Sequence, residues 1–242
     1  MNTSIAAKNV SQFLNNEHRH DLAARIGVCP YPVDPAFTHS SVNPSREPLI
    51  VAVGRWDSEQ KDGVLLAAAL TKYCRSGGRC KILIFGASCE ALDRVQKRFS
   101  NVSCQGAQSP NLIANAMARA RSLVLTSRWE SGPIVAFEAL CSGCTLISTD
   151  IPNMRELVGE GEFGTLAVSR SADAMADAIS KEMTFWDGGA RNATRIAAQW
   201  QPAFRVSLVC EVLLRAAGEL PNSLLSDGHV TSQNRQGMAG IS

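Results

Sequence analysis

From Leu49 onward the sequence alternates short apolar runs with longer amphipathic segments. The apolar runs suit buried strands, and the intervening segments have the length and periodicity of helices. Such alternation is typical of parallel strands joined by right-handed helical crossovers, so it predicts an α/β fold: a Rossmann-like parallel sheet with helices on both faces. We predict strands over 49–53, 81–85, 102–104, 123–126, 145–148 and 165–168, and helices over 62–76, 88–99, 109–120, 133–142, 153–158, 171–186 and 203–217.

The segments outside this alternation differ from it in composition. Residues 1–24 are expected to contribute no more than a short helical segment, and residues 25–48 hold prolines at 30, 32, 35, 44 and 48, which predicts an extended connector. Residues 218–242 are polar and poor in large apolar side chains, so we expect a disordered tail. The folded domain is therefore placed at 49–217.

Charge and apolar content exclude several classes of protein. A net charge of +2 and a pI near 8.1, without any Lys/Arg run, argue against a nucleic-acid binder. The sequence has no apolar stretch long enough to span a membrane and no apolar centre of a signal peptide near its start. We therefore expect a cytoplasmic protein.

The cysteines then lie in a reducing compartment and are interpreted as small buried hydrophobic residues. Cys141 and Cys144 have the spacing of half a zinc site, but the sequence has no second pair and its histidines lie far away. We expect these two thiols to pack helix against strand, and we predict no metal site.

The turn after the strand at 123–126 has the features of a phosphate site. Gly132 lets a ligand approach the backbone closely, and Pro133 suits the first position of a helix. The start of that helix offers unpaired amides and the positive end of the helix dipole.

Two carboxylates flank this turn. Glu138 follows about a turn and a half into the helix, where it can accept hydrogen bonds from ribose hydroxyls, and Glu130 lies in the loop on the other side of the phosphate position. An unpaired carboxylate between Phe137 and Ala139 on an apolar helix would be costly without a ligand. A phosphate between two hydroxyl-binding carboxylates suits a sugar nucleotide better than a dinucleotide.

Two cations and two glycines follow the first two predicted strands. Arg55 and Lys61 come after the strand at 49–53, and fixed cations in a dry cleft can stabilise the charge that develops on a departing diphosphate. Gly54 and Gly86 end the first and second strands, where ligands bind in sheets of this class, and Gly86 is expected to let the nucleotide pass close by.

These motifs resemble the signature of the retaining GT-B glycosyltransferases, the family that includes sucrose and glycogen synthases and many bacterial cell-envelope enzymes. The resemblance covers the spaced pair Glu130 and Glu138 and the Gly54-Arg55 step with Lys61. It extends to Thr149-Asp150 with Arg155-Glu156 and to the stretch from Val33 to Phe37, so it spans roughly residues 25–217 in order. Asp150 and Glu156 themselves are predicted to be turn and helix-capping acids.

The resemblance implies a function for the candidate residues. Glu130 would contact the donor sugar and Glu138 the ribose, and Arg55 and Lys61 would clamp the diphosphate. Because this chain has Pro133 where the family usually has glycine, the amides of the turn that contact phosphate would be those of Gly132, Ile134 and Val135. The candidate catalytic residues are thus Arg55, Lys61 and Glu130, and the candidate binding residues are Gly54, Gly86, Gly132, Ile134, Val135 and Glu138.

Only the C-terminal, donor-binding half of the GT-B fold is recognisable in the sequence. The resemblance implies a UDP- or GDP-linked sugar as donor, no metal, an acceptor that the sequence does not identify and an acceptor-binding domain or subunit supplied separately, through which the chain could associate with the inner face of a membrane. Residues 1–24 would be a helical remnant of the first domain. A role in polysaccharide or glycoconjugate synthesis is expected.

Alternative functions remain open. The same pocket could serve a non-catalytic nucleotide-sugar sensor or assembly partner, or a sugar-nucleotide epimerase of the related two-domain fold. Glycoside hydrolysis by the two carboxylates is disfavoured, because they are separated by a helix start and a phosphate site and cannot flank one sugar bond.

The sequence also predicts that replacing Glu130 spares the binding of a bare nucleotide and weakens only the binding of its sugar-bearing form.

Overall fold

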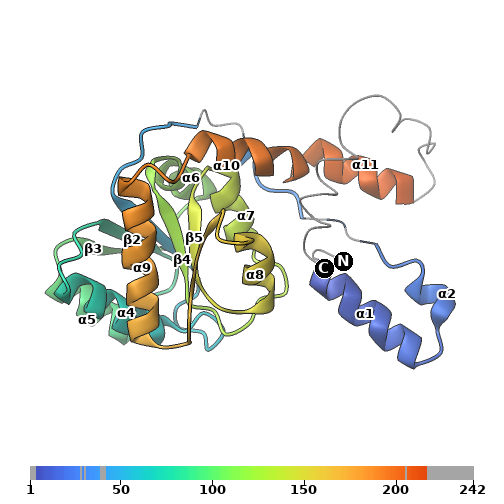
Figure 1. Ribbon diagram of the computed structural model, residues 1–242, viewed down its shortest axis with the longest axis horizontal. Coiled ribbons are helices and arrows are strands. Elements are labelled where there is room, and N and C mark those ends of the chain that lie inside the picture. The colour runs from blue at the N-terminus through green and yellow to red at the C-terminus, as the bar shows by residue number, and fades with distance from the viewer. Residues whose placement is uncertain (1–3, 28, 30, 39–41, 205, 217–242) are drawn as a thin grey trace.

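A computed structural model describes residues 4–27, 29, 31–38, 42–204 and 206–216. Its centre is one six-stranded sheet in the order β3-β2-β1-β4-β5-β6, in which every pairing is parallel (Figure 1). The strands are β1 (Leu49–Val53), β2 (Lys81–Phe85), β3 (Val102–Gly106), β4 (Ser122–Leu125), β5 (Thr145–Thr149) and β6 (Gly164–Ala167). The predicted fold class is confirmed.

Helices cover both faces of this sheet (Figure 1). The helices between and after the strands are α4 (Gly63–Arg75), α5 (Glu90–Arg98), α6 (Pro110–Arg119), α7 (Ile134–Cys141), α8 (Pro152–Val158), α9 (Ala172–Asp187) and α10 (Ala193–Trp200). A 3₁₀ turn, η1 (Gln201–Phe204), then leads to α11 (Val206–Ala216), and α1 (Ser4–Asn16), α2 (His20–Ala23) and α3 (Pro35–Thr38) precede the sheet.

Alternation along the central strand divides the core into two clusters. In β1, Ile50 and Ala52 point to the cluster under α4, α5 and α9, whereas Leu49 and Val51 point to the cluster under α6 and α7. All four are fully buried. A strand that is apolar on both faces must be covered on both sides, which accounts for the three-layer arrangement.

The predicted strands agree with the observed ones to within two residues, but three predictions about helices need correction. The helix α10 was not expected, and the predicted helix over 203–217 is divided into η1 and α11. The segment 25–48 is not purely extended, because α3 forms one helical turn within it. Val33 and Phe37 of this segment are 1% exposed and belong to the core, which explains why the turn is held in place.

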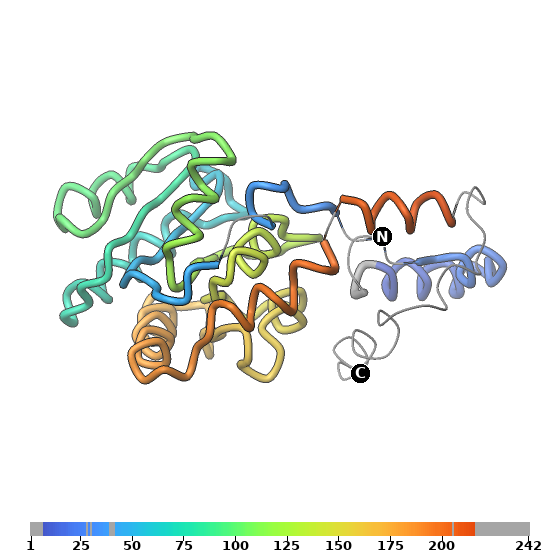
Figure 2. The backbone as a smooth tube through the Cα atoms, turned by 90° about the horizontal axis from the view of Figure 1, so that it is seen from above, coloured from blue at the N-terminus to red at the C-terminus, as the bar shows by residue number. Residues whose placement is uncertain are grey.

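The helices α1 and α2 pack against each other and lie beyond one end of the sheet, as does α11 (Figures 1 and 2). Exposed apolar side chains occur on these outlying helices, among them Phe13 on α1 and Leu213 on α11. The predicted tail over 218–242 lies outside the described residues. Among the described helices, none has the length and apolar character needed to cross a bilayer.

Candidate functional site

The strand order reverses direction between β1 and β4. From β1 the chain builds outward through β2 to β3, then returns to place β4 on the other side of β1. In sheets of this kind the loops at such a switch point diverge and leave a crevice beyond the carboxyl ends of the strands, where ligands bind. The two loops concerned follow β1 and β4, and they carry Arg55, Lys61, Glu130 and Gly132.

Hydrogen bonds to backbone carbonyls hold these two loops together. The hydroxyl of Thr126 donates to the Lys61 carbonyl over 2.8 Å, and the Arg128 amide donates to the Gln60 carbonyl over 2.8 Å. The Gln60 side chain in turn donates to the carbonyl of Trp129 over 3.1 Å. The positions of Lys61 and Glu130 are therefore fixed relative to each other by the chain around them.

Lys61 and Glu130 form an ion pair between the loops after β1 and β4. The Lys61 Nζ lies 2.5 Å from Glu130 Oε1, and their side chains are only 15% and 6% exposed. The same carboxylate oxygen accepts a hydrogen bond of 2.7 Å from the Ser127 hydroxyl, and Gln60 lies 3.4 Å from its other oxygen. Lys61 and Glu130 therefore lie together in a partly buried position. Arg55, on the same loop as Lys61, is exposed to solvent.

Gly54 and Gly86 are needed for close packing between the loops after β1 and β2. A Cβ at Gly86, whose φ is +102°, would lie 1.9 Å from the Gly54 carbonyl oxygen. A Cβ at Gly54 would lie 3.4 Å from the Lys61 Cγ, so the lysine stem passes directly over this glycine. Packing within the protein therefore accounts for glycine at both positions, independently of any contact with a nucleotide.

The start of α7 differs in one detail from the prediction. Pro133 is the N-cap residue, with a ψ of 88°, and the helix begins at Ile134, so proline does not occupy the first helical position. Its carbonyl accepts from the amides of Ala136 and Phe137 over 2.9 and 3.3 Å. The amides of Ile134 and Val135 precede these bonds at the positive end of the helix, as an anion site requires.

Glu138 is half-buried on the second turn of α7. Burial, together with the negative charge of Asp34 beside α3, raises the pKa of its carboxyl group to about 7. Within the described part of the chain this carboxylate has neither a cation nor a hydrogen-bond donor as partner, and such a position is unfavourable for an ionised group. Ribose hydroxyls would supply the missing donors.

Asp62, which was not among the predicted site residues, organises the base of the loop after β1. Its backbone is left-handed, with φ at 49°, and its side chain caps α4 by accepting from the Leu65 amide over 3.0 Å. The same carboxylate pairs with Arg170, which also donates to the Ser127 carbonyl, and lies 3.2 Å from Arg128. The acid directly before Gly63 was the signal for this helix cap.

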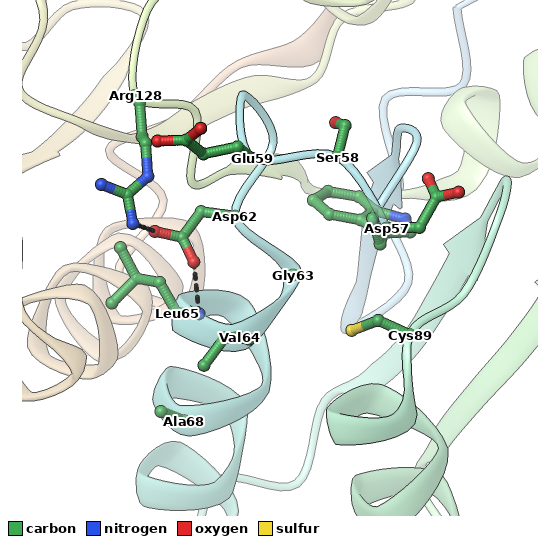
Figure 3. A pocket seen from close by; sticks show the side chains of 11 residues that line it. Asp57, Ser58, Glu59, Asp62, Gly63, Val64, Leu65, Ala68, Cys89 and Arg128 are labelled. Atoms are coloured by element: carbon green, nitrogen blue, oxygen red, sulfur yellow. Dashed lines mark hydrogen bonds and ion pairs between the residues drawn. The ribbon is translucent and has the colours of Figure 1, made fainter.

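A hollow of about 700 Å³ lies beside this loop (Figure 3). Its walls come from the loop after β1, the first turns of α4, the start of α5 and, through Arg128, the loop after β4; Asp57 and Glu59 place negative charge there. None of the predicted site residues lines the hollow, and its carboxylates would repel a diphosphate. We therefore place the candidate site at the switch point, between the loops after β1 and β4. The lining residues are Trp56, Asp57, Ser58, Glu59, Asp62, Gly63, Val64, Leu65, Ala68, Cys89 and Arg128.

The remaining predicted motifs have local partners. Asp150, after β5, pairs with Arg155 on α8 through two contacts, which lowers the pKa of its carboxyl group. Cys141 and Cys144 are both fully buried, and burial raises the pKa of their thiols to about 12 and 11. The described residues contain no group of three side chains suited to hold a metal ion.

The parallel sheet of this order, with its switch-point crevice, defines the class of α/β nucleotide-binding folds. A family model described as glycosyl transferases group 1 matches residues 47–184. The chain belongs to this family. A search of curated protein sequences finds no match.

Solved structures share the fold at low sequence identity. A variant of S. aureus TarM, in complex with fondaparinux, alpha-GlcNAc-glycerol and UDP, has a TM-score of 0.65 at 17% identity, over 78% of this chain and 39% of that one. Sucrose-phosphate synthase from Thermosynechococcus elongatus has a TM-score of 0.62 at 19% identity, over 80% of this chain and 52% of that one. Anabaena HepE in complex with UDP and glucose has a TM-score of 0.64 at 17% identity, over 84% of this chain and 60% of that one. The chain thus spans between two fifths and three fifths of these proteins.

Proposed function

We propose that this chain is the donor-binding part of a retaining glycosyltransferase that uses a nucleotide-diphosphate sugar. In this proposal Arg55 and Lys61 bind the diphosphate and Glu130 contacts the donor sugar. Glu138 accepts hydrogen bonds from the ribose hydroxyls. The phosphates lie against Gly54, Gly86 and the amides of Gly132, Ile134 and Val135.

The observation that carries the proposal is the meeting of Lys61 and Glu130 at the switch point of the sheet, in a chain of the glycosyl transferases group 1 family. A cation and a carboxylate side by side offer complementary partners to a phosphate and to sugar hydroxyls. UDP is present in the TarM and HepE complexes, which supports a uridine or a related diphosphate donor here.

The chemistry follows from this placement. The bond between the anomeric carbon and the diphosphate oxygen breaks, its electron pair stays on the diphosphate, and the acceptor hydroxyl oxygen forms the new bond to carbon. The departing diphosphate takes up the hydroxyl proton. Arg55 and Lys61 stabilise the charge on the leaving group, a task that a divalent metal performs elsewhere, so no metal is required.

The acceptor side of the reaction would come from another domain or subunit. The structural relatives are longer than this chain by a length that suits a second domain. We propose that this partner binds the acceptor, that it recruits the chain to the inner face of the membrane, and that the product is a hexose-containing polysaccharide or glycoconjugate. The chain itself would act in the cytoplasm.

Titration calorimetry tests the donor site. UDP and GDP are titrated into the chain with and without a chelator of divalent cations, and one of them is expected to bind equally well in both conditions, because its charge is met by Arg55 and Lys61. Strict dependence on magnesium would contradict the assignment of these cations. No binding of either nucleotide would contradict the proposed function itself.

A second candidate is a non-catalytic nucleotide-sugar-binding subunit. The specific observation in its favour is that the chain covers only part of each structural relative, so a binding pocket could be present without an acceptor site. Assays of donor consumption, with candidate partner proteins added, separate the two possibilities. Turnover supports the transferase, whereas tight donor binding without turnover in any combination supports the binding subunit.

A further inference from the structure

The two residues assigned to different parts of the donor neutralise each other in this structure. Lys61, assigned to the diphosphate, has its Nζ 2.5 Å from Glu130, assigned to the sugar. Both side chains are largely buried, at 15% and 6% exposure, so the attraction is only weakly screened by solvent. A diphosphate that binds Lys61 must therefore compete with Glu130.

A bare nucleoside diphosphate offers Glu130 no new partner in exchange for Lys61. When Lys61 turns to the phosphate, the Glu130 carboxylate keeps the Ser127 hydroxyl at 2.7 Å and the Gln60 amide at 3.4 Å but loses its cation. A carboxylate this buried is costly without its charged partner, and it then lies close to the negative charge of the phosphate.

A nucleotide-diphosphate sugar compensates Glu130 when it displaces Lys61. Sugar hydroxyls can donate hydrogen bonds to the Glu130 carboxylate while the Lys61 ammonium group pairs with the phosphate. The same two residues therefore bind the donor without leaving either charge unpaired. After transfer the sugar is gone, and the carboxylate competes again for Lys61.

We infer that the ion pair between Lys61 and Glu130 is a product-release device that selects the sugar-bearing donor against the bare nucleoside diphosphate. The inference rests on the proposed function. The sequence already predicted that Glu130 supports binding of the sugar-bearing form alone and that its replacement leaves bare nucleotide binding unchanged; the ion pair adds discrimination against the bare diphosphate. The structure instead implies that neutralising Glu130 strengthens the binding of the product.

The test is the affinity for the nucleoside diphosphate and for its sugar conjugate, measured by calorimetry on the full chain. Glu130→Gln keeps the shape of the side chain and removes its charge. It is expected to bind the bare diphosphate about tenfold more tightly than the wild type, because Lys61 is freed, and to lose the preference for the sugar-bearing form. Glu59→Gln is the matched control, since it removes one exposed acid from the same loop, and it should leave both affinities unchanged.

A double-mutant cycle with Lys61→Met separates the ion pair from a general effect of charge. In the Lys61→Met background there is no ammonium group to compete for, so Glu130→Gln relieves only the repulsion between carboxylate and phosphate, and its gain for the bare diphosphate should be clearly smaller than in the wild-type background. An equal gain in both backgrounds, or no gain in the wild-type background, would overturn the inference while leaving the proposed function intact. If no nucleotide binds the wild type, both fail together. Thermal unfolding shows whether each variant is folded, and Glu130→Asp, which retracts the carboxylate from Lys61, is a second variant with an expected gain in the same direction.

Discussion

Glu138 links the stability of the protein to its proposed ligand. Its pKa in the folded protein is raised to about 7, chiefly by burial and then by Asp34, so the folded state holds the proton more tightly than the unfolded state does. The stability that this group contributes is therefore fully present below pH 4.5, its ordinary pKa, and is lost as the pH rises through 7. Above that pH the ionised carboxylate destabilises the fold.

We predict that Glu138→Gln stabilises the protein at pH 8, by about 2 kcal/mol, and has little effect at pH 4.5. Thermal unfolding of the wild type and of Glu138→Gln between pH 4.5 and pH 8 measures this difference in stability. The same variant should weaken nucleotide binding at pH 8, because an amide replaces the carboxylate that faces ribose. A variant that is destabilised at pH 8 would show that Glu138 has a stabilising partner within the fold.

Gly86 offers a second test at the level of single residues. We predict that Gly86→Ala lowers the free energy of unfolding by about 3 kcal/mol or more, because its Cβ would collide with the Gly54 carbonyl and its φ is positive. Gly77→Ala is the matched control: its φ is +91°, but a Cβ there meets nothing within 4 Å. Urea unfolding should show a loss of only about 1 kcal/mol in this control. Equal losses in the two variants would mean that the contact with Gly54 is relaxed at no cost.

At the scale of helices and strands, the sequence predicted those elements whose apolar residues form a clear pattern. The central strands β1 and β4 are buried on both faces, so each is a largely apolar run, as in Leu49–Val53, and such runs are easily recognised. The helix α10 was missed because it is short and two of its buried residues, Ala193 and Ala197, are small, although their spacing with Ile196 is helical. Its N-cap, Asn192, accepts from the Arg195 amide over 3.0 Å and was an available signal.

The ends of two helices are joined by one buried side chain that no local pattern indicates. The Arg46 guanidinium, on a residue 8% exposed, donates to the carbonyls of Met117 and Ala120 at the end of α6, over 2.8 and 3.0 Å, and to that of Ser142 at the end of α7. A cation is favourable at helix carboxyl ends. The guanidinium adds to the bonds that the Met117 carbonyl accepts from the Ala120 amide over 3.2 Å and from the Cys144 thiol over 3.1 Å.

We predict that Arg46→Met destabilises the protein by about 3 kcal/mol, because three carbonyls lose their hydrogen bond to a buried guanidinium. Arg119→Met is the matched control: this arginine pairs with Glu47 at the surface over 2.8 Å, with both side chains 50% exposed. Its replacement should cost less than about 1 kcal/mol. Chemical denaturation measures both, and a cost for Arg46→Met as small as that of the control would show that water replaces the guanidinium.

At the scale of the whole molecule, sequence order predicted which residues share an edge of the sheet but not how they pair. Placing Lys61 and Glu130 after neighbouring strands required only the topology, since parallel strands end at the same edge. Their ion pair, and the anchoring of Asp62 by Arg170, depend on loop conformations fixed by contacts between residues up to 108 positions apart. Such contacts leave no periodic trace in the sequence.

The outlying helices bear on how the chain behaves alone. Phe13 on α1 is 62% exposed, and Leu213 on α11 is 55% exposed. In the proposed enzyme a partner domain would also cover the open side of the crevice. Transfer requires donor and acceptor to be held in attack geometry away from water, and a crevice bounded by one domain leaves the sugar accessible to solvent.

We therefore predict that the purified 242-residue chain binds its donor yet transfers little or no sugar, and that it self-associates as its concentration rises. Donor consumption is scored separately for transfer and for hydrolysis, with sedimentation run on the same samples. Leu213→Lys, which places a charge on the exposed face of α11, should reduce self-association without changing donor affinity, because α11 lies beyond the end of the sheet and contributes no residue to the site (Figure 1). Robust transfer by a monodisperse monomer would contradict the proposal that the acceptor site is supplied by a partner.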